Sequence, residues 1–264
     1  QIIKQYTDGL SMASVAQLYN VDPTAIDYIL RKYGIPKRSN RINSKKYDVD
    51  EDYFAVIDSE EKAYWLGFIM ADGCISINTD GRKSFGISLS SIDRDHLEKL
   101  KSCISSTHHI YDYVSKTGFS NKTSYSRLLI WNNKFVDNLI NQGVVEHKSN
   151  VLAPPTLSPE LVHHFIRGYI DGDGSITKSK GQYKIRILGT TGILDYIKSY
   201  IEANTDCKIK KYYKRHDADV VQSIDIGGNN QVLTILNLFY KDSTVYLQRK
   251  YERYMELYDK SCRA

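Results

Sequence analysis

The sequence predicts an α+β fold built by duplication, in which one αββαββα unit occurs twice with pseudo-twofold symmetry behind a small all-α segment. Two observations predict this fold. The nonapeptides at residues 65–73 (WLGFIMADG) and 166–174 (IRGYIDGDG) are similar, and the same succession of strand-like and helix-like segments follows each of them. We therefore divide the chain into a helix-turn-helix segment at 1–36, a basic linker at 37–52, a first repeat at 53–150 and a second repeat at 151–264.

The first 36 residues carry the start and stop signals of three short helices. The first ends at Asp8-Gly9, Ser11 can cap a second that runs to Tyr19-Asn20, and Asp22-Pro23 opens a third that ends at Gly34. A tight turn between the last two helices predicts a helix-turn-helix, similar to that of resolvase-type DNA-binding segments. Its exposed recognition positions would be Thr24, Asp27, Tyr28 and Arg31. A helical bundle that only packs on the main domain is the alternative.

The stretch from Lys37 to Lys46 is polar and basic and has no apolar period. We expect an extended linker that follows DNA phosphates, with Arg38 and Arg41 among its cations. A merely solvated charged linker is the alternative.

Each nonapeptide reads as an apolar helix with two small residues four positions apart, Gly67 and Ala71 in one and Gly168 and Gly172 in the other. Small residues on one face let two helix backbones approach closely. Each helix ends in an acid and a glycine, and we expect Gly73 and Gly174 to be left-handed caps. The paired helices would place two carboxylates at helix C-termini, which is unfavourable without a divalent cation.

These nonapeptides resemble the motif of LAGLIDADG homing endonucleases, and the resemblance extends from Tyr53 to the C-terminus. The resemblance implies Asp72 and Asp173 as ligands of Mg²⁺ (or Mn²⁺), with the carbonyls of Ala71 and Gly172 as backbone ligands. It also implies a basic residue near each scissile phosphate. The matching positions are Lys148 and Lys250, and Arg249, the neighbour of Lys250, is the alternative for the second of these positions. The first copy departs from the motif at Met70, where the second copy has Asp171.

The remaining elements follow in the same order in both repeats. Alternation predicts strands around 75–77 and 85–89 across an Asp80-Gly81 turn, then a helix at 93–103, a hairpin at 110–114 and 125–131, and a helix at 133–143. In the second repeat we expect strands at 183–188, 208–214 and 220–226 and helices at 193–204 and 231–240. In the family, the two sheets form a saddle over double-stranded DNA.

Cations follow the predicted strands of the second repeat. Lys178, Lys180, Lys184 and Arg186 share one parity, as do Lys208, Lys210 and Lys214, so we expect each set on one sheet face against the DNA. The first repeat offers fewer cations with more hydroxyls and amides: Ser76, Asn78, Arg82, Lys83, Lys122 and Arg127. A solvated antiparallel face would show similar alternation.

Composition agrees with a nucleic-acid enzyme of a reducing compartment. The net charge is +5, and residues 1–48 hold eight Lys/Arg against four Asp. The four cysteines are isolated, which argues against a zinc knuckle or a disulfide framework. No membrane span or signal peptide is visible, so we expect a bacterial or phage-host cytoplasm or an organelle matrix. The chain begins at Gln1 rather than methionine, and we expect that residues precede it.

Together these features predict a monomeric, site-specific endonuclease that binds double-stranded DNA at a long target. It would cut both strands across the minor groove and leave short 3′ overhangs, as the family does. An RNA maturase with the same fold could retain both acids, whereas a transcription regulator with this saddle would have eroded acids. A structural protein is the remaining class. The histidine pairs at 108–109 and 163–164 lack the spacing of a metal or histidine nuclease site.

Overall fold

The structure, a computed structural model, describes residues 1–37, 47–115, 123–146, 148, 151–209, 212–214 and 220–262. The chain divides into two compact units, Gln1–Asp48 and Val49–Ala264, and the larger unit holds both repeats. Within the described ranges, every helix is too short or too polar to cross a lipid bilayer. The finer boundaries expected at 36, 52 and 150 stay a prediction.

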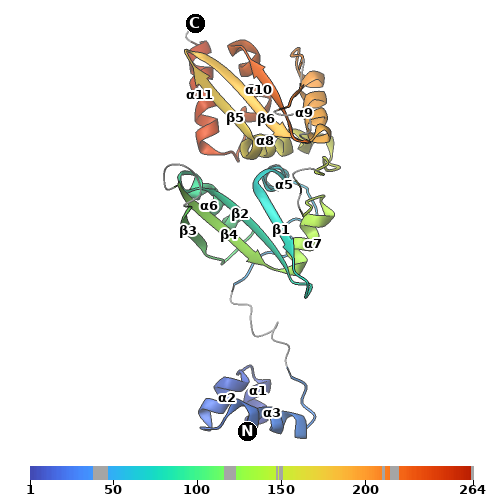
Figure 1. The fold of residues 1–264 in the computed structure, drawn as a ribbon, viewed down its shortest axis with the longest axis vertical. Coiled ribbons are helices and arrows are strands. Elements are labelled where there is room, and N and C mark those ends of the chain that lie inside the picture. The colour runs from blue at the N-terminus through green and yellow to red at the C-terminus, as the bar shows by residue number, and fades with distance from the viewer. Residues whose placement is uncertain are drawn as a thin grey trace. The chain divides into compact units, whose positions relative to one another are not determined.

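The smaller unit contains three helices, α1 (Ile2–Thr7), α2 (Met12–Leu18) and α3 (Pro23–Lys32), drawn in blue in Figure 1. The Ser11 hydroxyl accepts a hydrogen bond from the Ser14 N–H (3.0 Å), and the Asp22 carboxylate accepts one from the Thr24 N–H (2.8 Å). Both helix starts are therefore capped as the sequence predicts. The unit has its own small core, formed by Tyr6, Val15, Ala16, Ile26 and Leu30.

The first repeat of the larger unit has the predicted αββαββα order. Its elements are α5 (Glu60–Asp72), β1 (Gly73–Ile77), β2 (Lys83–Ser90), the single-turn 3₁₀ helix η1 (Ser91–Asp93), α6 (Arg94–Cys103), β3 (Ile110–Ser115), β4 (Thr123–Trp131) and α7 (Asn133–Asn141). The strands form an antiparallel sheet in the order β1-β2-β4-β3, and α6 and α7 pack against one of its faces. The other sheet face carries no helix of this repeat (Figure 1).

The second repeat has the same order and one additional helix. Its elements are η3 (Pro159–Leu161), α8 (Val162–Asp173), β5 (Gly174–Ser179), β6 (Gln182–Gly189), α9 (Thr191–Asn204), β7 (Tyr212–Tyr213), β8 (Gln222–Gly227), α10 (Asn229–Tyr240) and α11 (Gln248–Cys262). The sheet order β5-β6-β8-β7 repeats that of the first sheet. The last helix, α11, was not predicted, and it packs against α10 and β5.

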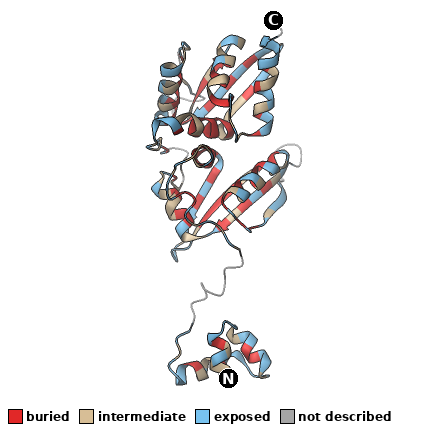
Figure 2. Ribbon diagram, turned by 180° about the vertical axis from the view of Figure 1, so that it is seen from behind, coloured by how far each residue is buried: buried red, intermediate tan, exposed pale blue. Residues whose placement is uncertain are grey.

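The two repeats meet along α5 and α8, which lie side by side between the sheets (Figure 1). Nine consecutive residues of α5, from Ala63 to Ala71, are buried, and α8 is buried in the same way from Phe165 to Asp171. Figure 2 shows these buried residues in red where the halves meet. One apolar core runs through both repeats, so the duplicated α+β fold is confirmed.

Two details of the prediction are wrong. Gly73 (φ −73°) and Gly174 (φ −95°) are extended rather than left-handed, because the chain passes directly from each helix into a strand. Glycine is needed there for space, since a Cβ would lie 2.7 Å from the Ile69 carbonyl oxygen at Gly73. In the second sheet, the strand expected at 208–214 is only the two residues of β7 among the described positions.

Candidate functional site

The helices that carry the two acids pack backbone against backbone. A Cβ added at Gly67 would collide with the carbonyl oxygen of Phe165, and one added at Gly168 would collide with that of Tyr64. One added at Gly172 would meet Ala71 and would lie 3.5 Å from a carboxylate oxygen of Asp72. The predicted role of the small residues is therefore confirmed. The two helix ends meet, and each ends in its acid.

Asp72 and Asp173 affect each other electrostatically. Burial, and then the negative charge of Asp173, raise the pKa of Asp72 to about 6. Asp72 nevertheless remains exposed to solvent. Burial also raises the pKa of Asp173, although the ammonium of Lys148 opposes this effect. A pair of crowded carboxyl groups that lack full charge compensation favours the binding of a cation.

The two predicted lysines lie at the C-terminal ends of these helices. The Lys148 ammonium donates to carbonyl oxygens of α5, and the nearly fully buried Lys250 ammonium donates to carbonyl oxygens of α8 and the start of β5. Burial lowers the pKa of each lysine to about 8. The acceptors of Lys148 are Ile69 (3.0 Å), Met70 (2.8 Å) and Ala71, and those of Lys250 are Ile170 (2.7 Å), Asp171 (2.5 Å), Gly172 (3.4 Å) and Gly174 (2.6 Å).

This placement makes the lysines equivalent in the two repeats. Each compensates the partial negative charge of a helix C-terminus, and each lies close enough to influence both acids. The carbonyls of Ala71 and Gly172, which the resemblance implies as metal ligands, accept hydrogen bonds from these ammonium groups. A direct action of either lysine on a phosphate stays a prediction.

The donor atoms fit a hard divalent cation. Asp72 and Asp173 supply carboxylate oxygens at the junction of the helices, and Ala71 and Gly172 supply carbonyl oxygens beside them. Oxygen donors of this kind suit Mg²⁺ or Mn²⁺. In the described part of the chain, no three His, Cys, Asp or Glu side chains lie together as a metal-binding group. The site therefore has the chemistry of a carboxylate pair rather than of a zinc centre.

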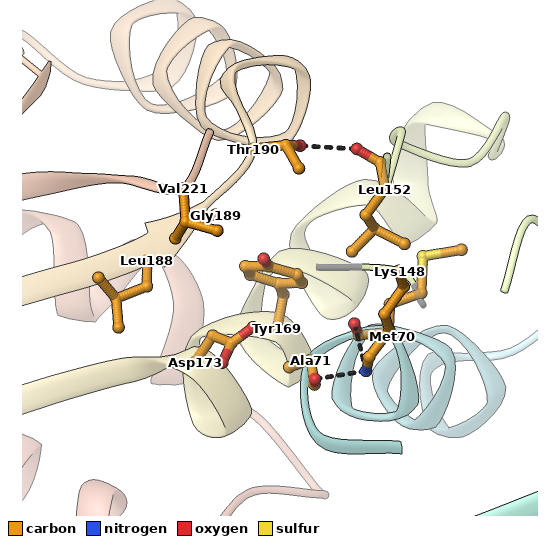
Figure 3. Close-up of a pocket in the computed structure, with 10 residues that line it drawn as sticks. All are labelled: Met70, Ala71, Lys148, Leu152, Tyr169, Asp173, Leu188, Gly189, Thr190 and Val221. Carbon is orange, nitrogen blue, oxygen red and sulfur yellow. Dashed lines mark hydrogen bonds between the residues drawn. The ribbon is translucent and has the colours of Figure 1, made fainter. Parts of the chain in front are cut away.

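A pocket of about 200 Å³ opens beside Asp173 (Figure 3). Asp173 and Tyr169 come from α8, and the Lys148 side chain lies on the other side with its ammonium at the end of α5. The end of β6 closes the pocket. Solvent and small ions can therefore reach Asp173. The remaining lining residues are Met70, Ala71, Leu152, Leu188, Gly189, Thr190 and Val221.

In the second sheet, α9 and α10 pack against one face, and the opposite, helix-free face carries two of the predicted cations, Lys184 and Arg186. Both contact the carboxylate of Asp225 on β8, at 2.5 Å for Lys184 and 2.7 Å for Arg186. Their neighbours Ile185 and Ile187 are buried on the other face, so this alternation is as predicted.

Other predicted cations of this repeat lie elsewhere. Lys178 pairs in register with Tyr183 and contacts Glu256 of α11, so it lies on the helix-covered face. The parity prediction was wrong because the two-residue turn at Lys180-Gly181 reverses which residue numbers share a face. Lys180 is in that turn, with φ +48°. Lys208 and Lys214 are exposed but lie outside β7.

The equivalent face of the first sheet is more aromatic. Arg127 is exposed beside Tyr111 in the register of β3 and β4, and Tyr113 stacks on Tyr125. Ser76 is exposed on β1, and Asn78 closes the β1–β2 turn with Arg82. Arg82 pairs with Asp80 (2.6 Å). The prediction that Lys83 faces the DNA is wrong, because Lys83 contacts Asp137 of α7 on the helix-covered side of the sheet.

Several predicted contact residues cannot be placed. Arg38, Arg41, Lys122 and Lys210 lie outside the described residues. In the smaller unit, Arg31 is exposed and pairs with Asp27 at 2.7 Å, and Thr24 and Tyr28 are exposed on the same helix. Asp27 is only half-buried, and its two cationic partners, Arg31 and Lys37, occupy its carboxylate. Three of the four recognition positions on α3 are therefore accessible.

A comparison of the sequence with known protein families agrees with the fold of the first repeat. Residues 59–142, which span α5 to α7, match the family described as LAGLIDADG-like domain. The first repeat of the chain is therefore similar to a LAGLIDADG-like domain. This confirms the resemblance predicted from the nonapeptides. No curated protein sequence matches the chain.

The chain is similar in structure to several solved LAGLIDADG proteins that are bound to DNA. Meganuclease I-SmaMI bound to uncleaveable DNA is 15% identical with a TM-score of 0.48, over 76% of this chain and 90% of that one. The LAGLIDADG homing endonuclease I-GzeII in complex with its DNA target is 13% identical with a TM-score of 0.49, over 75% and 88%. I-LtrWI bound to target DNA is 14% identical with a TM-score of 0.48, over 79% and 90%.

The helix α8 contains a buried acid, Asp171, at the position where α5 has Met70. Asp171 accepts hydrogen bonds from the hydroxyls of Tyr64 (2.8 Å) and Tyr240 (2.5 Å) and from the Leu247 N–H (2.7 Å). Tyr64 belongs to α5, so the contacts of Asp171 join the two repeats. Met70, at the matching position, is buried in apolar surroundings. The difference between Asp171 and Met70 that is seen in the sequence is therefore a difference in the packing between the repeats.

A second buried charge also joins the repeats, and the sequence pattern missed it. Arg167, within the second nonapeptide, is 1% exposed and donates to Glu60 at the start of α5 (2.7 Å). It also donates to the carbonyls of Val245 and Phe239, both at 3.0 Å. A buried arginine needs such partners, and only its position inside an apolar nonapeptide could have indicated them.

Proposed function

We propose that this protein is a site-specific DNA endonuclease that hydrolyses one phosphodiester bond on each strand of a duplex. The observation that carries the proposal is the pair Asp72 and Asp173, brought together at the ends of two closely packed helices and both raised in pKa. Packing alone accounts for the glycines. It does not account for two crowded carboxyl groups at helix ends that are already partly negative.

Asp72 and Asp173, with the carbonyls of Ala71 and Gly172, would hold a divalent cation such as Mg²⁺ or Mn²⁺. A bound cation of this kind supplies charge stabilisation at a phosphate and lowers the pKa of a bound water. The chain's own contribution is position. The glycine-mediated contact of α5 and α8 fixes the two carboxyl groups relative to each other, and the buried Asp171 and Arg167 contacts hold the repeats in that register.

Lys148 and Lys250 would reduce the negative charge at the helix ends and assist at one scissile phosphate each. Their lowered pKa values mean that each ammonium loses its proton more readily than a surface lysine does. The helix-free face of each sheet would contact the DNA. The protein would bind a long target site as a monomer. It would cut the two strands across the minor groove and leave short 3′ overhangs.

A maturase that binds intron RNA is the second candidate, because such a protein can retain both acids. A transcription regulator is disfavoured by the presence of Asp72 and Asp173. The charge of the helix-free sheet faces does not distinguish duplex DNA from structured RNA, because both have a negatively charged backbone. Cleavage of DNA decides between these candidates.

The test is a cleavage selection from a randomised duplex DNA library in Mg²⁺. We expect the wild-type protein to enrich one cleaved sequence family, and to enrich none in EDTA. The double variant Asp72→Asn/Asp173→Asn should also yield no cleaved product. Specific binding of DNA without cleavage in either Mg²⁺ or Mn²⁺ would favour a regulator. Failure to bind any duplex, together with binding of structured RNA, would favour the maturase.

A further inference from the structure

Arg186 and Asp225 form a cross-strand pair on the helix-free face of the second sheet. They lie directly opposite each other in the register of β6 and β8. Arg186 donates from Nε to Oδ1 of Asp225 and from Nη2 to Oδ2, both at 2.7 Å. This is the two-bond, planar arrangement that fixes a guanidinium in orientation as well as in position.

The carboxylate of Asp225 also has contacts with two other residues. The Lys184 ammonium lies 2.5 Å from Oδ2, and the Ser223 hydroxyl lies 3.3 Å from Oδ1. The Asp225 side chain is only 10% exposed, whereas that of Arg186 is 53% exposed. Hydrogen bonds from Arg186, and to a lesser extent from Lys184, lower the pKa of Asp225 to about 2, so it stays ionised in any neutral buffer. Asp225 therefore serves to hold Arg186.

The arginine keeps its other edge available. A guanidinium has five N–H donors, and two of them are directed at Asp225. The remaining donors on Nη1 and Nη2 lie side by side, and within the described residues no acceptor for Nη1 is found. Two parallel N–H groups match the O6 and N7 acceptors of guanine in the major groove. The same two N–H groups also match two oxygens of a phosphate, and the two cases differ because only a base contact produces a sequence preference.

Among the described residues, the first sheet has no equivalent of this pair. The β1–β2–β4 register places Cys74, Gly86 and Leu129 where the second sheet has Ser175, Arg186 and Asp225. The guanidinium of Arg127 extends over Gly86, and Nη2 would lie 3.2 Å from a Cβ at that glycine. Among the described residues, no carboxylate forms an ion pair with Arg127. The first sheet thus has a cation on this face that is not fixed by an acid.

We propose that Arg186 reads one guanine in the half of the target that lies under the second repeat, and that Asp225 is its positioning residue. The proposal rests on the proposed DNA-binding function and adds that the two half-sites differ. The half under the first repeat would have no guanine read in this way. A target for this pseudo-symmetric protein is therefore not a palindrome at this position.

The test is a binding selection from a randomised duplex library, with Ca²⁺ in place of Mg²⁺ because the larger ion accepts oxygen ligands but polarises water less. The proteins compared are the wild type, Arg186→Lys, Asp225→Asn and the control Arg253→Lys, whose half-exposed arginine pairs with Glu256 on α11. We expect one guanine position whose preference falls about 5- to 150-fold in Arg186→Lys. The same preference should fall in Asp225→Asn, and thermal melting of each variant checks its fold.

The control separates base reading from charge. Arg253→Lys, which makes the same change in an ion-paired arginine of α11, should leave every base preference unchanged. Wild-type specificity that survives Arg186→Lys at every position would overturn the inference and leave the proposed function intact, because a salt bridge that only supports the sheet would behave in this way. A wild-type protein that enriches no duplex sequence would overturn both.

Discussion

At the scale of single residues, Asp72 makes metal binding depend on pH. Burial and the charge of Asp173 raise its pKa to about 6. Below that pH the carboxyl is protonated and cannot bind a cation, so the Mg²⁺ affinity of the metal-free protein should fall about tenfold per pH unit, and should be nearly constant above pH 7. Calorimetric titration between pH 5 and pH 8 measures this. An affinity that is unchanged across the range would contradict the role of Asp72.

The same pKa shift has a consequence for stability without metal. The ordinary pKa of an aspartate is 3.8, so between about pH 4 and pH 6 the native Asp72 holds a proton that the unfolded chain has released. The contribution of this group to the free energy of unfolding is therefore fully present below pH 4 and is lost as the pH rises through 6. Mg²⁺ should restore stability above pH 6. Thermal melting in EDTA and in Mg²⁺ compares the two, with Asp72→Asn as the control that removes the effect.

Lys148 and Lys250 occupy matching positions but differ in burial. We expect Lys148→Met and Lys250→Met to slow cleavage at saturating DNA more than they weaken binding, because each charge acts on the reacting phosphate. Lys250→Met should also lower the free energy of unfolding by about 1–3 kcal/mol, since it leaves buried carbonyls without donors. Lys148→Met, whose side chain is half-buried, should cost less. Variants that lose affinity but keep their turnover would identify the lysines as phosphate anchors.

At the scale of elements, the glycines of α5 and α8 set the distance between the acids. An alanine at Gly67 or Gly168 places a methyl group against a backbone carbonyl that cannot move without separating the helices. We expect each change to lower the free energy of unfolding by about 1–3 kcal/mol and to reduce cleavage. Gly227→Ala on β8 is the matched control, because nothing lies within 4 Å of its added Cβ. Urea unfolding compares the three, and equal stabilities would contradict the close packing.

Most elements could be predicted from the sequence because their signals are local. The caps Ser11 and Asp22, the Asp80-Gly81 turn and the small residues of the nonapeptides all act within a few positions. The errors concern relations between strands and between repeats. The Lys178 prediction failed because a two-residue turn changes face parity, and the Asp225 partner of Arg186 comes from a strand 39 residues away. The buried partners of Asp171 are still more distant in sequence, so no periodicity indicates them.

At the scale of the whole molecule, the smaller unit is expected to add affinity rather than chemistry. Deletion of residues 1–46 removes eight Lys/Arg but neither the acids nor Lys148 and Lys250, so the remaining protein should still cut DNA. With about three to five of those cations on phosphates, the log–log salt slope of binding should fall by about 3 to 4, at roughly 0.9 per contact. Footprinting should show protection shortened at one end only. An unchanged footprint and slope would mean that this unit does not contact the DNA.

The central claim is that Asp72 and Asp173 together form the cutting site of a DNA endonuclease. The most direct measurement is strand-resolved cleavage of a selected duplex in Mg²⁺, with binding of the same duplex followed in parallel, for Asp72→Asn, Asp173→Asn and the exposed control Asp259→Asn. We expect double-strand cleavage to fall at least about 100-fold in either acid variant, with specific binding largely retained and the control unaffected. Wild-type cleavage rates in Asp72→Asn or Asp173→Asn would contradict the assignment of these acids.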